Sequence, residues 1–325
     1  MKISVFFLLQ ERQKEGGRVP AGKRYLTLFG MDLEQKAIER VKTASEMSLR
    51  MYGRPLIVTD SGGKDSAVCR EIVRRAGIPF ELHHNLTTAD APQTIYYIRQ
   101  IFREYESKGI PCNIHYPYYK GQRVTMWSLI PMKRFPPTRL QRYCCEILKE
   151  SSCQDRFITT GVRWAESQKR RNNRGVFENY TRDRNKKIIL NNDNVDERML
   201  FETCAIKGKR ICNPIVDWLD RDIWDFIQSE RIPVNPLYEW GFHRGGCIGC
   251  PVAAKNRWTE FRIFPSYQRA YLRAFGVMLT YIQEQGIATR WKDAGDVFAW
   301  WMEDKNTEGQ ISLSDLELWR AENEE

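Results

Sequence analysis

The sequence contains no apolar run long enough to span a membrane. A transmembrane helix needs about 18 or more consecutive apolar residues, and no segment of this 325-residue chain approaches that length. The apolar stretch at residues 3–9 runs directly into a charged segment without a small-residue cleavage site. We therefore expect a strand there rather than a signal peptide. These absences predict a cytoplasmic protein with no membrane partner.

Histidine is scarce, and no Ser/His/Asp pattern accompanies the four residues present. A hydrolase triad therefore has no support in this sequence. His83 and His84 are adjacent within a predicted strand, so their side chains face opposite sides of it. Neither has a partner nearby in the sequence, and we interpret both as structural.

Cysteine, by contrast, is abundant. Nine cysteines are many for a chain without a secretory signal, and neither their odd number nor the chain length suits a disulfide framework. Four of them are grouped in the sequence, as the adjacent pair Cys144 and Cys145 and as the pair Cys247 and Cys250. Grouped thiols in a reducing compartment are better explained as metal ligands or reactants.

The charge is positive and unevenly spread. The net charge is +10, from 51 basic and 41 acidic residues, and residues 163–187 hold nine Lys or Arg against three Asp or Glu. We expect this basic run to be a loop. It is either a solvated surface or a binding site for a polyanion such as nucleic acid, and charge alone does not separate the two.

Strands alternate with helices between residues 55 and 232. This order predicts an α/β fold with a mainly parallel, twisted sheet covered by helices on both faces. Beyond residue 260 the pattern changes to helices only, rich in Trp and Tyr. We predict an N-terminal strand and helix extension (residues 1–52), a central domain that contains the sheet (53–258) and a C-terminal helical appendage (259–325).

A glycine loop follows the first predicted strand of this sheet. Its sequence is SGGKDS, comprising Ser61, Gly62, Gly63, Lys64, Asp65 and Ser66. In an open parallel sheet, ligands bind beyond the carboxyl ends of the strands. Glycines let backbone N–H groups converge on an anion, and the following helix presents its positive end to it. Lysine adds a mobile positive charge, the serines add hydroxyl donors, and the aspartate suits Mg²⁺ or a helix cap.

Two common phosphate loops do not match. The Walker pattern needs four residues between its first Gly and Gly-Lys, and the dinucleotide pattern Gly-x-Gly-x-x-Gly is absent. The hexapeptide instead resembles the pyrophosphatase loop (PP-loop) of the adenine-nucleotide α-hydrolase superfamily. Members of that superfamily typically cleave ATP between its α and β phosphates and adenylate an acceptor. The resemblance implies ATP and Mg²⁺ at this loop.

The two cysteine groups point to a cluster. A Cys-x-x-Cys turn such as CIGC (residues 247–250) can belong to a zinc knuckle, a redox pair or an iron–sulfur site. The adjacent pair in LQRYCCEILKE (residues 140–150) favours the third, because adjacent cysteines rarely serve tetrahedral zinc and four thiolates suit a cubane cluster.

The same cysteines carry a second resemblance, covering residues 55–255. Tandem Cys-Cys followed far downstream by Cys-x-x-Cys is similar to the cluster motif of assimilatory adenylyl-sulfate reductases. Residues 213–251 and the segment GVRWAESQKR (161–170) resemble parts of the phosphoadenylyl-sulfate reductase (PAPS reductase) superfamily. The resemblance implies a [4Fe–4S] cluster and contacts from three residues to anionic substrate groups. The cluster ligands would be Cys144, Cys145, Cys247 and Cys250, with Cys153, Cys204 or Cys212 as substitutes for one of the tandem pair, and the substrate contacts would be Arg163, Ser167 and Arg170.

One feature departs from the reductases. They carry a nucleophilic cysteine near the C-terminus, and no cysteine follows Cys250 here. The chain also resembles the ATPase of bacterial DNA phosphorothioation systems, which has the cluster but lacks that nucleophile. Related tRNA thiolases use the same loop.

These resemblances lead to one preferred function and two alternatives. The preferred function is an ATP pyrophosphatase that adenylates an acceptor for sulfur transfer, with Lys64, Asp65 and Arg163 as catalytic residues. Its expected partners are a sulfur donor such as a cysteine desulfurase and, from the basic run, a nucleic-acid acceptor. The first alternative is a reductase of adenylyl sulfate or its 3′-phosphate; the second is a non-catalytic, nucleic-acid-associated subunit.

Overall fold

The computed structural model describes residues 32–181, 187–191, 193 and 208–303. The strand expected at residues 3–9, Cys204 and residues 182–186 of the basic run lie outside the described residues. The chain divides into two units, and each unit consists of three segments that alternate along the sequence with those of the other. The sheet unit takes Met1–Leu86, Asp90–Pro117 and Lys149–Gly246, and the helical unit takes Thr87–Ala89, Tyr118–Leu148 and Cys247–Glu325.

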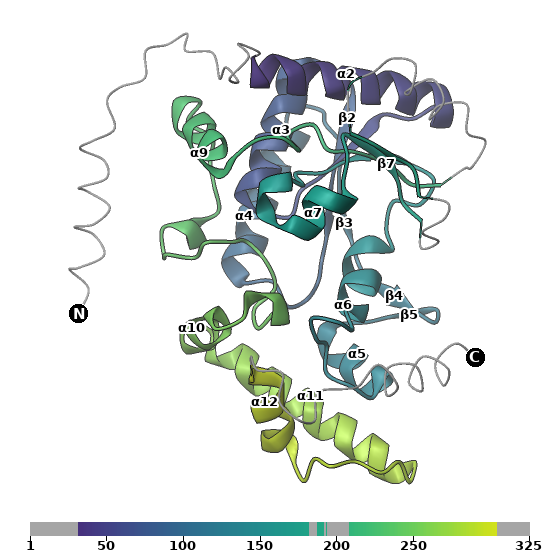
Figure 1. The fold of residues 1–325 in the computed structure, drawn as a ribbon, viewed down its shortest axis with the longest axis vertical. Coiled ribbons are helices and arrows are strands. Elements are labelled where there is room, and N and C mark those ends of the chain that lie inside the picture. The colour runs from purple at the N-terminus through teal and green to yellow at the C-terminus, as the bar shows by residue number, and fades with distance from the viewer. Residues whose placement is uncertain (1–31, 182–186, 192, 194–207, 304–325) are drawn as a thin grey trace, which may run out of the picture. The chain divides into compact units, whose positions relative to one another are not determined.

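The sheet unit is built on a seven-stranded, mainly parallel sheet (Figure 1). Five neighbouring strands run parallel, and β7 pairs antiparallel with both β9 and β8. The predicted α/β fold is thereby confirmed. In spatial order the strands are β3 (Cys112–His115), β2 (Phe80–Asn85), β1 (Leu56–Thr59), β6 (Phe157–Thr159), β9 (Arg210–Cys212), β7 (Phe177–Asn179) and β8 (Ile189–Leu190).

Four helices bury their apolar sides in the main core of the sheet unit, together with Leu56, Val58 and Leu82 of the central strands. These helices are α2 (Leu33–Tyr52), α3 (Lys64–Ala76), α4 (Pro92–Glu106) and α9 (Asp220–Ser229). Side chains alternate between the faces of a strand. The intervening Ile57 accordingly packs in a separate cluster, with Ile158 and Ile211 and with the partly buried Cys153 and Tyr180.

Local sequence explains where these helices begin and end. The Asp32 carboxylate accepts a hydrogen bond from the backbone N–H of Glu34 over 3.0 Å and caps the start of α2. Helices α2 and α3 end at Gly53 and Gly77, which have φ values of +63° and +66°.

The basic run is more ordered than the expected loop. It holds a 3₁₀ turn (Trp164–Glu166), helix α7 (Gln168–Asn173) and strand β7. The prediction was wrong here because a three-residue strand shows no usable periodicity. What places β7 is its pairing with the distant β9, in which Phe177 lies opposite Cys212.

The helical unit contains the predicted C-terminal helices. Trp301 packs against Tyr271 with ring centroids 4.5 Å apart, and Phe261 and Phe275 complete the aromatic centre. No helix among the described residues has both the length and the apolar character needed to cross a bilayer. Its elements are the β4–β5 hairpin (Tyr118–Tyr119 and Gln122–Arg123), α5 (Met126–Lys133), α6 (Tyr143–Cys145), which leads into a π-helical turn (Glu146–Glu150), a 3₁₀ turn (Pro251–Ala253), α10 (Asn256–Ile263), α11 (Pro265–Glu284) and α12 (Ala294–Met302).

Candidate phosphate-binding site and cysteine group

The glycine loop joins β1 to α3, beyond the carboxyl end of the strand as predicted. Gly62 has a φ of +75°, a left-handed conformation that favours glycine. A Cβ on Gly62 would also lie 2.7 Å from Cγ2 of Thr94. Both its backbone conformation and its surroundings therefore require glycine at this position.

Asp60 shapes the loop from within. Its buried carboxylate accepts hydrogen bonds from the backbone N–H of Gly62 over 2.8 Å and from the Ser66 hydroxyl over 3.0 Å. It also forms an ion pair with Arg70. Because the carboxylate already has these three partners, we assign Asp60 the role of holding the loop in shape. The exposed Ser61 hydroxyl lies 3.3 Å from that of Ser66.

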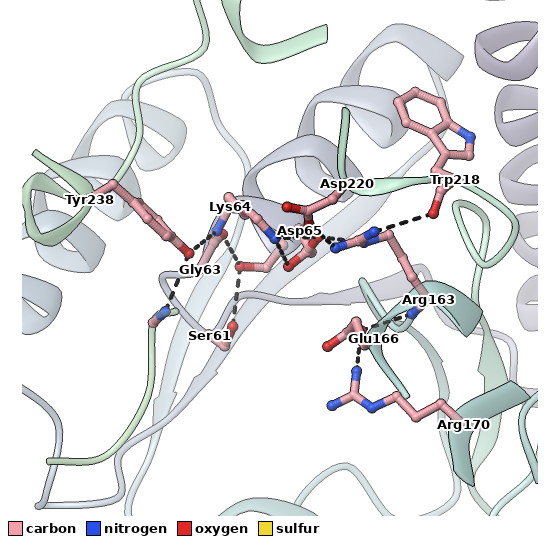
Figure 2. A network of polar contacts seen from close by, with 12 residues as sticks. Ser61, Gly63, Lys64, Asp65, Arg163, Glu166, Arg170, Trp218, Asp220 and Tyr238 are labelled. Atoms are coloured by element: carbon pink, nitrogen blue, oxygen red, sulfur yellow. Dashed lines mark hydrogen bonds and ion pairs between the residues drawn. The ribbon is translucent and has the colours of Figure 1, made fainter. Parts of the chain in front are cut away.

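Two cations and two carboxylates meet at the start of α3 (Figure 2). Lys64 Nζ lies 3.1 Å from both Asp65 Oδ2 and Asp220 Oδ1. Arg163 donates from Nε to Asp65 Oδ1 over 2.6 Å and from Nη2 to Asp220 Oδ1 over 2.8 Å. Each carboxylate therefore contacts both cations. We call Lys64, Asp65, Arg163 and Asp220 the charged quartet.

Arg163 is the rigid member of the charged quartet. Its side chain is 2% exposed, and Nη1 donates to the Trp218 carbonyl over 3.2 Å. Burial lowers the pKa of Arg163, but the Asp65 charge and the hydrogen bonds to Asp220 and Asp65 together outweigh that effect and raise the pKa overall. Likewise, burial raises the pKa of Asp220, and hydrogen bonds from Lys64 and Arg163 more than reverse this. Both groups are therefore charged at neutral pH.

The segment that carries Arg163 passes very close to α3. A Cβ on Gly161 would lie 2.7 Å from the Asp65 carbonyl carbon and 2.8 Å from its oxygen. These are backbone atoms of the first helical turn, which cannot move aside as a flexible side chain can. A glycine at position 161 therefore lets the GVRWAESQKR segment bring its arginine to the loop.

Ser167 and Arg170 lie on that segment but outside the charged quartet. Ser167 is the N-cap of α7, where its hydroxyl accepts the Arg170 N–H over 3.2 Å. The Arg170 guanidinium forms an ion pair with Glu166, whose carboxylate also accepts the Arg163 N–H over 3.0 Å. Through Glu166, Arg170 is linked to the backbone of Arg163 (Figure 2).

Three residues of this site were not predicted. Asp220 belongs to the charged quartet, and the Tyr238 hydroxyl accepts hydrogen bonds from the N–H groups of Lys64 and Gly245, over 2.8 and 3.3 Å. Asn235 Nδ2 donates to the Gly62 carbonyl over 3.1 Å. The one signal that could have found them is that all three fall in residues 213–251, the stretch that resembles the reductase superfamily.

All four predicted cluster cysteines fall in the helical unit. A hydrogen bond with Cys145, burial, and the charges of Cys145, Cys247 and Cys250 together raise the pKa of the Cys144 thiol far above its ordinary value. These effects require Cys145, Cys247 and Cys250 to lie near the Cys144 thiol. The structure therefore groups cysteines that are separated by about a hundred positions in sequence.

The surroundings of this cysteine group are polar and well ordered. Arg142 Nη2 donates to Cys145 Sγ over 3.1 Å. Cys247 Sγ lies 3.3 Å from the Thr87 hydroxyl, and the Gly249 N–H donates to Glu260 over 2.7 Å. The Tyr271 hydroxyl donates to the Ile248 carbonyl over 3.0 Å. These bonds fix the Cys-x-x-Cys turn. Cys153 and Cys212, the described substitutes for a tandem cysteine, both fall in the sheet unit.

Comparison with known proteins identifies the family. The phosphoadenosine phosphosulfate reductase domain matches residues 55–253. The chain belongs to this family. PAPS reductase domains are enzymatic and act on nucleotides, in keeping with a phosphate loop at the carboxyl edge of the sheet. The match includes the glycine loop, Arg163 and all four grouped cysteines.

Individual relatives are distant. An uncharacterized protein of Methanocaldococcus jannaschii is 24% identical over 273 residues, covering 81% of this chain and 48% of its own. The adenosine 5′-phosphosulfate reductase of Allochromatium vinosum is 25% identical over 201 residues, covering 60% and 67%. The chain spans about half the length of the archaeal relatives. Among solved structures, the PAPS reductase of Candida auris is 18% identical with a TM-score of 0.39, covering 70% of this chain and 98% of its own.

Proposed function

We propose that this PAPS reductase-family chain is a PP-loop ATP pyrophosphatase that adenylates an acceptor for sulfur transfer. The observation that carries the proposal is the charged quartet. Two carboxylates beside a phosphate loop would repel the phosphates of a nucleotide unless a divalent cation lay between them. Carboxylate and phosphate oxygens are the ligands that Mg²⁺ prefers. Asp65 and Asp220 thus favour Mg²⁺–ATP as the ligand.

Nucleotide binding would exchange partners within the charged quartet. The carboxylates would turn from the two cations to Mg²⁺, which would leave Lys64 and Arg163 to bind the phosphates. Arg163 suits this role because its guanidinium is held by the Trp218 carbonyl and presents a planar fork. The loop amides and the N-terminus of α3 would bind the remaining phosphate oxygens. Ser61 and Ser66 would add hydroxyl donors, and Ser167 and Arg170 would lie beside the phosphates of the nucleotide.

The reaction follows from this arrangement. An oxygen of the acceptor attacks the α-phosphorus, a P–O bond forms, and the bond to the β-phosphate oxygen breaks to release pyrophosphate. Lys64 and Arg163 stabilise the charge that moves onto the departing phosphates. The acceptor oxygen, now bound to AMP, is a good leaving group. A sulfur nucleophile from the donor displaces it, and AMP leaves with that oxygen.

The cysteine group fits an iron–sulfur cluster. Four thiols are the donor set that a [4Fe–4S] cluster requires, and three of these four lie near enough to Cys144 to raise its pKa. Arg142 adds a positive charge next to Cys145 that offsets the thiolate charge. Cys144, Cys145, Cys247 and Cys250 would hold the cluster. When bound, it supplies one-electron redox chemistry.

A nucleic-acid acceptor suits the basic run. Lys169 and Arg171 are exposed on α7, six and eight positions beyond Arg163 in the sequence. Cations that neutralise nucleic-acid phosphates make binding weaken as salt rises. The sulfur donor, in this proposal, is a cysteine desulfurase.

A sulfonucleotide reductase is the second candidate. The family match and the adenosine 5′-phosphosulfate reductase relative favour it. Its substrate would bind the same loop, and the product would be sulfite rather than pyrophosphate.

Pyrophosphate release from ATP, measured with anaerobically purified protein, tests the proposal. Substitution Lys64→Met should abolish release, and Asp65→Asn should make it insensitive to Mg²⁺. Lys108→Met is the matched control, because Lys108, just beyond the end of α4, contacts Glu104 and the Tyr105 ring and not the charged quartet. Sulfite production from adenylyl sulfate without pyrophosphate release from ATP would establish the reductase instead.

A further inference from the structure

Two histidines and a cysteine meet on the sheet unit, and none of them belongs to the charged quartet or the cysteine group. His83 lies on β2, and His115 ends the neighbouring β3 (Figure 1). In the pairing of these strands, His115 lies opposite Asn85, two positions beyond His83. The two histidines therefore share one face of the sheet. Cys153 comes from the segment that precedes β6.

The three potential ligand atoms converge. His83 Nδ1 lies 2.7 Å from His115 Nε2, and Cys153 Sγ lies 3.6 Å from the first and 3.7 Å from the second. All three lie within 4.8 Å of one another. We propose that His83, His115 and Cys153 form a site for a single zinc-type metal ion, separate from the cysteine group.

Two of the three distances match tetrahedral coordination. Zinc bonds of about 2.0–2.1 Å to nitrogen and 2.3 Å to sulfur place N and S ligands about 3.6 Å apart at the tetrahedral angle. Both observed N–S distances agree with this value. The N–N distance of 2.7 Å is that of a hydrogen bond. A metal in place of the shared proton would widen it by about 0.6 Å.

A carboxylate behind His83 supports the same assignment. Glu81 Oε2 lies 2.9 Å from His83 Nε2, and Glu81 Oε1 accepts a hydrogen bond from Arg156 over 3.1 Å. A carboxylate that holds one ring N–H leaves the other nitrogen, here Nδ1, free to bind a metal. Metal-binding histidines commonly have such a partner, which fixes the ring and its tautomer.

The protonation states also suit a metal. Burial lowers the pKa of His83, and burial together with the His83 and Lys209 charges lowers that of His115 to about 4. Both rings are therefore neutral at neutral pH, which is the form that binds metals. Burial raises the pKa of the Cys153 thiol overall, although Ser152, Lys209 and Arg156 oppose the rise, so the thiol proton must leave when zinc binds.

The backbone at Cys153 is held in an unusual conformation. Its φ is +57°, and that of Asp155 is +51°. Residues other than glycine rarely adopt this region, and such outliers cluster at functional sites. Here the turn directs a thiol toward two imidazoles. Three protein ligands leave the fourth position of a tetrahedral ion open, as at zinc sites that bind water or substrate.

The proposal does not rest on the adenylation chemistry, and zinc itself is the probe. The full chain, purified without oxygen, is dialysed against Zn²⁺ and analysed for zinc and iron content. X-ray absorption at the zinc edge then identifies the ligands without interference from iron. We expect one zinc per chain, with one sulfur at about 2.3 Å and two nitrogens at about 2.0–2.1 Å.

Variants locate the ion. His115→Ala and Cys153→Ser should lose the zinc, and Glu81→Gln should weaken zinc affinity by about 10–100-fold, as loss of such a partner usually does. His243→Ala, at an exposed histidine, and Cys112→Ser, on β3, are the matched controls and should keep it. Iron content and thermal unfolding temperature verify that each variant is folded.

Several results would overturn the assignment. A four-sulfur shell would place zinc in the cysteine group. Zinc retained by both His115→Ala and Cys153→Ser would place it elsewhere. Absence of bound zinc would rule out a zinc-type site.

Discussion

Alanine in place of Gly62 should destabilise the protein by an amount set by the loop geometry. The left-handed conformation, with φ of +75°, costs a residue with a Cβ about 1–2 kcal/mol. The new Cβ would meet Thr94 Cγ2 at 2.7 Å, and overpacking of this kind costs about 1–3 kcal/mol. Together, these effects should lower the free energy of unfolding by about 2–5 kcal/mol.

Two further variants separate these contributions. Gly53 has a φ of +63°, and nothing lies within 4 Å of the position that a Cβ would take there, so Gly53→Ala should show only the conformational cost of about 1–2 kcal/mol. In Gly62→Ala/Thr94→Ser, serine removes the clashing methyl group but keeps the hydroxyl that accepts from Asn235 over 2.8 Å. The double variant should therefore recover most of the overpacking cost.

Urea unfolding measures the change in unfolding free energy for each variant. Thr94→Ser alone serves as a further control. The loop geometry would be refuted if Gly62→Ala and Gly53→Ala lost the same stability. It would also be refuted if the serine substitution recovered nothing.

Two other predictions concern charge. Burial raises the pKa of Asp217, but hydrogen bonds from Arg40 and Lys36 outweigh burial and hold the pKa below its ordinary value of 3.8. The ionised Asp217 therefore contributes its full stabilisation above pH 3.8. That stabilisation is lost as the pH falls through the pKa that Asp217 has in the folded protein. Asp217→Asn should lower the free energy of unfolding in urea by about 1.5–3 kcal/mol at pH 7. The difference between the variant and the original protein should shrink below pH 3.8, and a difference that does not depend on pH would contradict this. Arg142→Gln removes a positive charge next to Cys145, so the reduction potential of the proposed cluster should become more negative in protein-film voltammetry. An unchanged potential would show that Arg142 does not act on the cluster.

Local sequence was sufficient to predict the alternation of strands and helices and the phosphate loop. Leu56–Thr59 is a short apolar run, Gly53 and Gly77 follow amphipathic helices, and the loop hexapeptide stands between a strand and a helix. Each of these features depends on residues close together in the chain. For that reason they could be recognised without knowledge of the tertiary fold.

Contacts between distant segments could not be predicted in the same way. Asp220 reaches Lys64 from the start of α9, and Tyr238 reaches the same residue's N–H from 174 positions away. His83 had no visible partner because His115 joins it only through the pairing of β2 with β3. Strand order decides such contacts, and strand order is not written in any one segment.

Nucleotide binding tests the central proposal most directly. Isothermal titration of anaerobically purified protein with ATP, adenylyl sulfate and its 3′-phosphate, each with and without Mg²⁺, compares the three ligands at one site. We predict that ATP binds most tightly and only with Mg²⁺, and that Asp220→Asn weakens this dependence. Tight binding of a sulfonucleotide without Mg²⁺, with ATP weak, would contradict the proposal.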